Sequence, residues 1–416
     1  MTTPLKRSAK RSLRRPAALG FALLIGAGAL AACGSSDDDS SSGSGGSSDS
    51  SSSSGSISAA CSLDNPPTSS ASAPSIADLG TASGKVGVIL PDTTSSTRYT
   101  QFDKPLLQKY LTKAGLTPDI QNAGGDTAKF AQIAQSMIGS GVKVLIIDSI
   151  DASSGAGVEK LAAKNGVKVI DYDRVNLGGT ANYYVSFDNE EVGKLQAQAM
   201  VDCLDAQNVS DPNIIMMDGG TDTDNNAVLF KKGAHEVLDP LAKAGKLTIT
   251  AEATVKGWDV TQAASDFQQA LTSAGGTVDG VLAANDDIAN AVVGALKGQG
   301  LDGHVVVTGQ DSTVVGLQNI VNGLQSMTIF KSYEQEAQAA TLLATALVSG
   351  KDPADAGLTL TKFDDPDSAS HKIQALLLPP QVITQANLST VVDSGQTTQA
   401  EICKGITDAC AKVGLN

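Results

Sequence analysis

The residues of this 416-residue chain that could do chemistry follow short apolar runs. In the stretch 168–189, KVIDYDRVNLGGTANYYVSFDN, one such run leads into Asp173-Arg174 and another leads into Asp188-Asn189. A carboxylate accepts hydrogen bonds, and a guanidinium offers a rigid fork of donors. Because each hydroxyl of a sugar both donates and accepts, the Asp-Arg pair predicts the binding of a polyhydroxylated ligand.

Groups of the same kinds recur after other apolar runs. They are Asp92 with Arg98-Tyr99 beyond it, the loop Asp222–Asn226, Asn285-Asp286-Asp287, Gln310-Asp311 and Lys331. The single Trp of the chain, Trp258, lies in the loop 256–259, although aromatic residues make up only 4% of the sequence. Any one polar residue at such a position could simply cap a helix. The recurrence favours a sugar site, where polar groups combine with aromatic rings.

The elements that must position these residues are short buried strands. The expected strands are Lys85–Leu90, Lys143–Asp148, Lys168–Tyr172, Asn213–Met217, Val278–Ala283 and His304–Thr308. Their near-continuous Val and Ile content is typical of parallel strands that are buried on both faces. Helical patterns such as Thr127–Ile138 lie between them, and Gly141 and Gly166 mark helix ends. This alternation predicts an α/β fold with two parallel sheets, which bind ligands at the carboxyl ends of their strands.

The N-terminal segment predicts export. Six basic residues precede the apolar run from Ala17 to Leu30, which is too short to span a bilayer, so residues 1–32 are expected to be a signal peptide. Leu30-Ala31-Ala32-Cys33-Gly34 resembles the lipobox of bacterial lipoproteins, and an ordinary signal peptide with a chance Cys is the alternative. We therefore expect lipidation of Cys33 and a location on the extracytoplasmic face of the cell membrane. Residues 33–84 are rich in Ser, Gly and Pro and are expected to form a tether, and the folded body is expected to begin at Lys85.

Charge and cysteine content limit the possible partners. Cleavage before Cys33 would lower the net charge from −14 by six, to −20, which argues against binding to nucleic acid or to anionic lipid. Four cysteines follow, namely Cys61, Cys203, Cys403 and Cys410, and they allow three disulfide connectivities. Cys403 and Cys410 are close enough to pair locally. Cys203 lies on an apolar helical face, so a buried free thiol is its simplest interpretation, and the pairing of the four cysteines stays open.

Motifs for other chemistry are incomplete. The sequence has no G-x-x-x-x-G-K-[ST] motif, so an ATPase would have to be a separate chain. The pattern Asp222-x-Asp224-x-Asn226 begins like a calcium loop, but it has Ala227 in place of the Gly and Gly233 in place of the Glu. The three histidines are isolated from one another and from the cysteines. We expect no cofactor, no metal and no enzymatic activity.

Several longer motifs carry a resemblance to a known family. They are YDR (172–174), YYVSFDNEEVGKLQAQAMVD (183–202), DNNAVLFKKG (224–233), KGWD (256–259), AANDD (283–287), VTGQD (307–311) and MTIFK (327–331). Together they resemble the D-xylose-binding proteins of bacterial ABC importers, which belong to the sugar-binding branch of the type I periplasmic-binding proteins. The likeness covers about Lys85 to Gly405.

The resemblance implies two Rossmann-like lobes that close over one monosaccharide. Lobe 1 would comprise residues 85–188 and 329–360, lobe 2 residues 189–328 and 361–401, and a C-terminal tail residues 402–416. The family's sugar contacts carry over to Arg98, Asp173, Arg174, Asn189, Asn285, Asp311 and Lys331, with Trp258 and Tyr99 as stacking walls. The implied partners are a monosaccharide, most of all D-xylose, and a membrane permease with its separate ATPase, and the binder is expected to be a monomer.

Several alternatives remain open from the sequence. Position 99 is Tyr where the family commonly has Trp, and the loop Pro91–Thr97 is rich in Ser and Thr rather than charged, so ribose, arabinose, glucose or galactose could replace xylose. A sugar sensor of the same fold, coupled to a signalling receptor, is a second possible role. A sugar-processing enzyme lacks a motif for a general acid or nucleophile. A DNA-binding regulator of this fold lacks a DNA-binding head.

Overall fold

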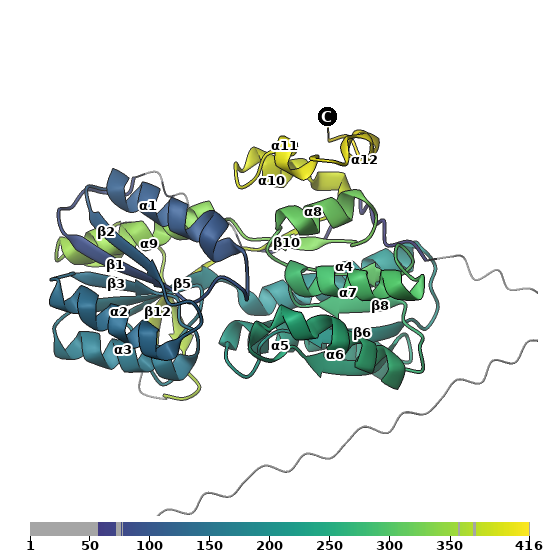
Figure 1. Ribbon diagram of the computed structural model, residues 1–416, viewed down its shortest axis with the longest axis horizontal. Coiled ribbons are helices and arrows are strands. Elements are labelled where there is room, and N and C mark those ends of the chain that lie inside the picture. The colour runs from purple at the N-terminus through teal and green to yellow at the C-terminus, as the bar shows by residue number, and fades with distance from the viewer. Residues whose placement is uncertain (1–56, 72–75, 77, 357, 369–371, 416) are drawn as a thin grey trace, which may run out of the picture. The chain divides into compact units, whose positions relative to one another are not determined.

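Strands and helices alternate along the computed structural model and form an α/β fold (Figure 1). The structure describes residues 57–71, 76, 78–356, 358–368 and 372–415, which lie in one unit, Ser53–Asn416. The expected signal peptide, Cys33 and most of the expected tether lie outside the described residues. Two mainly parallel sheets confirm the predicted fold class.

The first lobe is built on a seven-stranded sheet with the order β11-β12-β5-β4-β3-β1-β2. Neighbouring strands are parallel except for β11 and β12. The strands are β1 (Lys85–Leu90), β2 (Thr117–Asn122), β3 (Val144–Ile147), β4 (Lys168–Tyr172), β5 (Tyr183–Phe187), β11 (Thr361–Asp364) and β12 (Lys372–Leu378).

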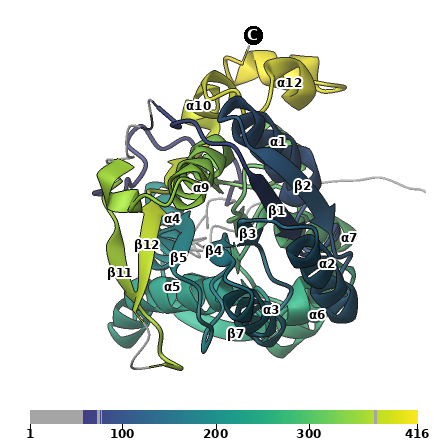
Figure 2. The same ribbon diagram turned by 90° about the vertical axis from the view of Figure 1, so that its left-hand side faces the viewer.

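Helices cover both faces of this sheet, as Figure 2 shows with the lobe toward the viewer. They are α1 (Lys104–Lys113), α2 (Thr127–Gly139), α3 (Ala152–Lys164) and α9 (Tyr333–Val348), and a π-helical turn, η1 (Tyr99–Asp103), precedes α1. Side chains of a strand alternate between the faces. Val86 and Val88 of β1 therefore pack with α1 and α9, whereas Ile89 packs with α2 and α3.

The second lobe is built on a parallel four-stranded sheet with the order β7-β6-β8-β9. Its strands are β6 (Asn213–Asp218), β7 (Thr248–Thr254), β8 (Gly280–Ala283) and β9 (Val306–Val307). Its helices are α4 (Asn189–Ala206), α5 (Asn225–Lys243), α6 (Val260–Ser273), α7 (Asp286–Gln299) and α8 (Val314–Val321). Ile214 and Met216 of β6 pack with α4 and α5, and Ile215 and Met217 pack with α6 and α7.

The chain passes between the lobes from β5 to α4, from β10 to α9 and from β12 to β13. Here β10 (Thr328–Phe330) and β13 (Gln381–Ile383) form a two-stranded antiparallel sheet that contacts α4. The ends of these segments adjoin the carboxyl ends of the parallel strands. Residues at the crossings therefore lie beside the ligand-binding edge of both sheets.

The expected assignment of residues 361–401 to the second lobe is wrong for the part up to Leu378. Strands β11 and β12 extend the sheet of the first lobe, where Leu376 of β12 aligns with Val185 of β5. Ile373, Ala375, Leu376 and Leu378 are buried in that lobe's core. The sequence gives no local signal for this choice, because an apolar strand can complete the edge of either sheet.

The N-terminal part of the described chain is folded onto the body, contrary to the expected tether up to residue 84. Ala59 is fully buried and its N–H donates to the Gly303 carbonyl at 2.9 Å, and Leu79 joins the core of the first lobe. Cys61 forms a disulfide with Cys203, so the interpretation of Cys203 as a free thiol is wrong. The two cysteines are 142 residues apart, and only the fold brings them together.

The C-terminal segment packs beside α8. It contains the short helices α10 (Ser389–Asp393), α11 (Gln399–Ile402) and α12 (Thr407–Lys412), and the local Cys403–Cys410 pair forms a disulfide, as the spacing suggested. Three 3₁₀ turns complete the element order: η2 (Lys256–Trp258), η3 (Pro353–Ala356) and η4 (Gln385–Asn387). None of the helices in the described residues is long and apolar enough for a membrane span.

Candidate functional site

Eight of the nine side chains that the sequence singles out line one cavity between the lobes. They are Arg98, Tyr99, Asp173, Arg174, Trp258, Asn285, Asp311 and Lys331. Each follows or begins an element at the carboxyl edge of a sheet, where ligands bind in parallel α/β folds. The space between these side chains has a volume of about 290 Å³.

Arg98, at the start of η1, is held by three acidic side chains. Its Nε and Nη2 each lie 2.8 Å from an oxygen of Asp103, its Nη1 lies 2.8 Å from Asp173 Oδ1, and its Nη2 lies 2.6 Å from Glu336 Oε2. Burial opposes the charge, but these three acids outweigh it and raise the pKa of Arg98 well above its ordinary value. The guanidinium therefore stays positively charged, and its three acidic partners fix its orientation.

Asp173 follows β4 with a left-handed backbone, φ 59°, which few non-glycine residues adopt. Its carbonyl oxygen accepts hydrogen bonds from Ser186 Oγ at 2.7 Å and Asn226 Nδ2 at 3.0 Å, which offset the strain. Burial alone would raise the pKa of the carboxyl, but Arg98 and Lys331 lower it below its ordinary value. The carboxylate is an ionised acceptor that faces the cavity.

Asp311 is the corresponding carboxylate of the second lobe, with φ 101°. Its Oδ1 lies 3.2 Å from Lys331 Nζ and accepts a hydrogen bond from the Tyr333 hydroxyl at 2.9 Å. Its Oδ2 accepts from Ser96 Oγ of the first lobe at 3.0 Å. Burial would raise the pKa of Asp311, but Lys331 and Arg98 lower it.

Arg174 joins the lobes at another wall of the cavity. Its Nε lies 3.2 Å from Asp224 Oδ2 of the second lobe and 3.8 Å from Asp148 Oδ1 of the first. Asp224 also accepts a hydrogen bond from Trp258 Nε1 at 3.1 Å. Burial raises the pKa of Asp224, although Arg174 acts in the opposite direction. Asp224 thus links the ring of Trp258 to the guanidinium of Arg174.

Trp258 and Phe230 form an aromatic corner, with ring centroids 6.4 Å apart and an edge-to-face angle of 73°. Trp258 also has a left-handed backbone, φ 58°. Its ring lies directly on Gly219, where any β-carbon would collide with it. A glycine after β6 is therefore required for the ring to reach the cavity.

The formal charges of the cavity lining balance. Arg98, Arg174 and Lys331 supply the cations, and Asp173, Asp224 and Asp311 supply the carboxylates. Asn285 adds an amide whose Oδ1 caps α7 by accepting from the Ile288 N–H at 2.9 Å, while its Nδ2 donates to the Ser95 carbonyl oxygen at 3.5 Å and has a second N–H for the cavity. A balanced lining suits a neutral ligand with many hydroxyls better than an anion or a cation.

Asn189 is the predicted site residue that the structure places elsewhere. Its Nδ2 donates to Asn226 Oδ1 at 2.9 Å and to Ser186 Oγ at 3.2 Å, so it lies behind Asn226, which lines the cavity in its place. Asn189 and Asn226 both lie in the first turn of a helix that follows a buried, apolar strand. The sequence alone does not distinguish the one that faces the ligand.

Sequence reasoning left out six residues of the lining. They are Ser95, Ser96, Asp224, Asn226, Phe230 and Gln310. Asp224, Asn226 and Gln310 lie in polar loops that the sequence had already marked. Ser95 and Ser96 lie in a loop with no charged pair, and Phe230 looks like an ordinary apolar residue of a helix, so their types carried no signal.

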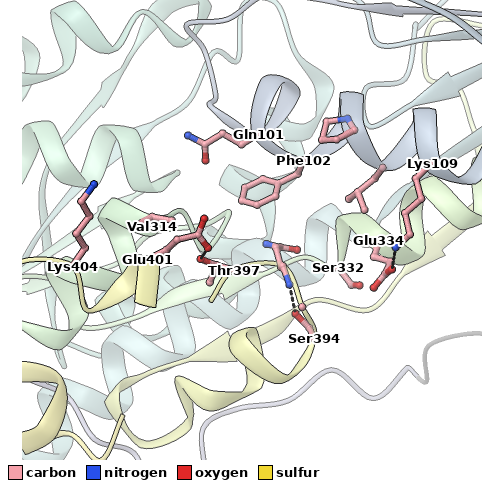
Figure 3. A pocket seen from close by; sticks show the side chains of 14 residues that line it. Gln101, Phe102, Lys109, Val314, Ser332, Glu334, Ser394, Thr397, Glu401 and Lys404 are labelled. Carbon is pink, nitrogen blue, oxygen red and sulfur yellow. Dashed lines mark hydrogen bonds and ion pairs between the residues drawn. The ribbon is translucent and has the colours of Figure 1, made fainter. Parts of the chain in front are cut away.

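A second, larger hollow lies beside α1 and the C-terminal segment (Figure 3), with a volume of about 1420 Å³. Phe102 and Lys109 of the first lobe face Thr397 and Glu401 across it. None of the nine predicted site residues lines this groove. Its ion pair Lys109–Glu334 is partly exposed at 3.2 Å, unlike the buried pairs of the interlobe cavity. The convergent polar groups therefore make the smaller cavity the candidate functional site.

Metal coordination finds no support in the part of the chain that the structure describes. Within it, no cluster of three or more His, Cys, Asp or Glu side chains is arranged to hold an ion.

Comparison with known proteins finds a matching family model and several relatives. Residues 86–352 match the periplasmic binding protein domain. The chain is 33% identical over 303 residues to the D-xylose-binding periplasmic protein of Escherichia coli, which covers 73% of this chain and 88% of that protein. It is 32% identical over 330 residues to the multiple sugar-binding periplasmic protein SbpA of Azospirillum brasilense, with 76% and 90% covered.

Solved structures show the same architecture. A carbohydrate transporter solute binding protein from Chloroflexus aurantiacus, in complex with D-glucose, superposes with a TM-score of 0.69 at 28% identity and covers 77% of this chain and 98% of that one. A solute binding protein from Clostridium phytofermentans with bound β-D-glucose gives 0.68 at 28% identity, with 76% and 99% covered.

Proposed function

Since the chain belongs to the sugar-binding branch of the periplasmic binding proteins, a family of non-enzymatic solute-binding proteins of ABC transporters, we propose that it captures a neutral monosaccharide in the interlobe cavity and delivers it to a membrane permease. D-xylose is the first candidate for the sugar. The family membership also makes the protein extracytoplasmic.

The observation that carries this proposal is the balanced, buried lining. Three cations and three carboxylates surround a cavity of about 290 Å³. An anionic sugar acid or a cationic amino sugar would bring a buried charge of its own for which the balanced lining has no partner, which costs binding free energy. A neutral sugar satisfies both sets of groups through its hydroxyls.

Each group has a role that follows from its chemistry. Asp173 and Asp311 accept hydrogen bonds from sugar hydroxyls, while Arg98, Arg174 and Lys331 donate to sugar oxygens. The second amide N–H of Asn285 also donates. Trp258, Phe230 and Tyr99 offer ring faces to the C–H groups of the sugar. Because these residues come from both lobes, the ligand gains all its contacts only when the lobes are closed.

The choice of sugar rests on the relatives. Relatives at 33–34% identity are D-xylose-binding proteins, others bind multiple sugars, and the solved neighbours hold D-glucose. D-glucose differs from D-xylose by one hydroxymethyl group. The D-xylose-binding relatives favour the pentose.

Calorimetric titration tests the proposal. The protein from residue 33 onward, carrying Cys33→Ser, is unfolded without reductant and refolded to remove any carried-over sugar. It is then titrated with D-xylose, D-glucose, D-ribose, L-arabinose, D-galactose, D-glucuronate and D-glucosamine. We expect one neutral sugar to bind with one site at micromolar affinity or better, roughly −8 kcal/mol. Preference for a charged sugar, or no binding to folded protein, would contradict the proposal.

We further propose that Cys33 carries the lipid anchor and that the ATPase of the transporter is a separate chain. The lipobox-like sequence ahead of Cys33 supports the first, and the lack of a phosphate-binding motif supports the second. Metabolic labelling with an alkyne fatty acid should mark the wild-type protein and leave Cys33→Ser unlabelled. Equal labelling of both would refute the anchor.

A further inference from the structure

Tyr333 lies beside the cavity without lining it. It is the first residue of α9, directly after the crossing from β10, and two residues beyond Lys331. Its side chain is fully buried. A tyrosine with a buried hydroxyl needs a hydrogen-bond partner, and the identity of that partner indicates what the side chain does.

The hydroxyl of Tyr333 is directed to Asp311 of the second lobe. It lies 2.9 Å from Asp311 Oδ1 and 3.0 Å from the Asp311 carbonyl oxygen. Since Asp311 has φ 101°, a region that non-glycine residues avoid, contacts to both its carboxylate and its backbone hold an orientation that the chain would not otherwise keep.

The ring of Tyr333 supports Arg98 of the first lobe. The Arg98 Cζ lies 4.2 Å from the ring centroid, within the range of a cation–π contact. Four of the five N–H groups of Arg98 are directed to Asp103, Asp173 and Glu336, which leaves one for the cavity. Of the tyrosine rings around the guanidinium, that of Tyr333 is nearer than those of Tyr99 and Tyr172, at 5.7 and 6.0 Å. Phe102 backs the ring at a centroid distance of 5.3 Å and forms part of the wall of the larger groove (Figure 3).

One side chain at the crossing therefore touches a cation of one lobe and a carboxylate of the other. We propose that Tyr333 is a positioning residue, which sets Asp311 and Arg98 in their relative places when the lobes close. This rests on the proposed function. The hydroxyl acts through Asp311, and the ring acts through Arg98.

The two halves of the side chain are separable by substitution. Tyr333→Phe keeps the ring under Arg98 and removes only the bond to Asp311. Tyr110→Phe is the matched control, because Tyr110 is a buried tyrosine on α1 whose hydroxyl contacts Glu334, away from the cavity lining. We expect Tyr333→Phe to weaken binding of the preferred sugar about 10-fold and Tyr110→Phe to leave the affinity within about 2-fold.

A double-mutant cycle with Asp311→Asn shows whether the hydroxyl acts through Asp311. If it does, the double variant binds the sugar about as weakly as Asp311→Asn alone, because the hydroxyl affects binding only by orienting the carboxylate, and Asp311→Asn has already removed that carboxylate. Independent losses that multiply would overturn the proposal. Unchanged affinity in Tyr333→Phe would also overturn it.

Deoxy analogues of the preferred sugar give a readout that a merely structural role would not change. The analogue that lacks the hydroxyl held by Asp311 is the one for which Asp311→Asn has the smallest effect. The loss of affinity caused by Tyr333→Phe should also be smallest for that analogue. Uniform weakening across all analogues would overturn the proposal. Absence of sugar binding by the wild-type protein would instead refute the proposed function, and the role of Tyr333 with it.

Discussion

Three residues of the cavity have backbone torsions that L-residues seldom adopt, namely Asp173, Trp258 and Asp311. Each is held by contacts on both its backbone and its side chain, as the bonds from Ser186 and Asn226 to the Asp173 carbonyl illustrate. Strain of this kind persists only where the surroundings over-determine the conformation. The side chains are thus oriented before a ligand arrives.

Removal of one carboxylate should abolish tight binding without unfolding the protein. In Asp311→Ala, Lys331 loses its 3.2 Å partner and one set of sugar hydroxyls loses its acceptor. We expect affinity to fall about 100-fold, close to 3 kcal/mol, by calorimetry. Asp364→Ala, which breaks an exposed pair with Lys372, is the control and should bind normally. Normal binding by folded Asp311→Ala would remove Asp311 from the site.

Stability should depend on pH through buried carboxyls next to the site. Burial raises the pKa of Asp286 from 3.8 to about 7, against hydrogen bonds from Gln325 and Thr313 that lower it. Between these values the unfolded chain has released the proton while the folded protein still holds it. The free energy of unfolding therefore falls as pH rises, by about 1.4 kcal/mol per pH unit, until about pH 7.

Asp286→Asn should remove this part of the pH dependence. The substitution is close in shape, and Gln325 can turn its amide so that its otherwise unpartnered oxygen accepts from the new N–H. Guanidinium unfolding at pH 4.5 to 7, with disulfides intact, should show a shallower decline than in wild type. Exposed Asp119→Asn should leave the decline unchanged. Equal slopes in all three proteins would mean that Asp286 is ionised throughout. Raised pKa values of Asp287 and Glu336, about 6 and about 8, act in the same direction.

At the scale of elements, α4 and α5 touch through glycine. A β-carbon on Gly233 of α5 would collide with the Glu190 carbonyl of α4, and one on Gly193 would collide with the Phe230 carbonyl. The close approach places Asn189 and Asn226, at the two helix starts, within hydrogen-bond distance. Helix packing therefore sets Asn226 at the cavity and Asn189 behind it.

Gly233→Ala should destabilise the second lobe. Because the collision is with backbone, the helices must move apart, at a cost of about 1–3 kcal/mol in the free energy of unfolding. Gly294→Ala in α7 is the control, since nothing lies within 4 Å of its β-carbon position, and it should gain about 0.5–1 kcal/mol. Denaturant unfolding checks both. A neutral Gly233→Ala would show that the helices can separate freely.

What the sequence could predict follows from what each element buries. Strands such as β3 have continuous apolar runs and were found, and the helix ends at Gly141 and Gly166 have the expected positive φ. The edge strands β2 and β7 escaped notice because they are half-exposed and mix polar with apolar residues. The polar residues that follow the predicted strands account for most of the predicted residues that line the cavity. That Asn226 rather than Asn189 lines the cavity depends on the contact between α4 and α5, which no local sequence pattern encodes.

At the scale of the molecule, direct contacts join the lobes across the cavity. Ser96 bonds Asp311 at 3.0 Å and Arg174 pairs with Asp224 at 3.2 Å. A sugar adds further bonds that need both lobes, so it shifts the population toward the closed form. We expect the radius of gyration, measured by small-angle X-ray scattering, to fall when the preferred sugar is added.

Asp311→Ala provides the control for closure, and its radius of gyration should not respond to the same sugar concentration. A wild-type protein whose scattering does not change while calorimetry shows binding would mean that the sugar enters lobes already closed. The contacts between lobes would then hold without ligand.

The first described residues of the chain are attached to the second lobe, although they precede the first lobe in the sequence. Ser58 N–H donates to Gln207 at 2.6 Å, and Cys61 is covalently joined to Cys203 of α4. A mechanical pull on the chain ahead of Ile57 is therefore borne by the second lobe, through a covalent bond. The first lobe can swing without carrying that load, so tension on the leading segment neither drives closure nor resists it.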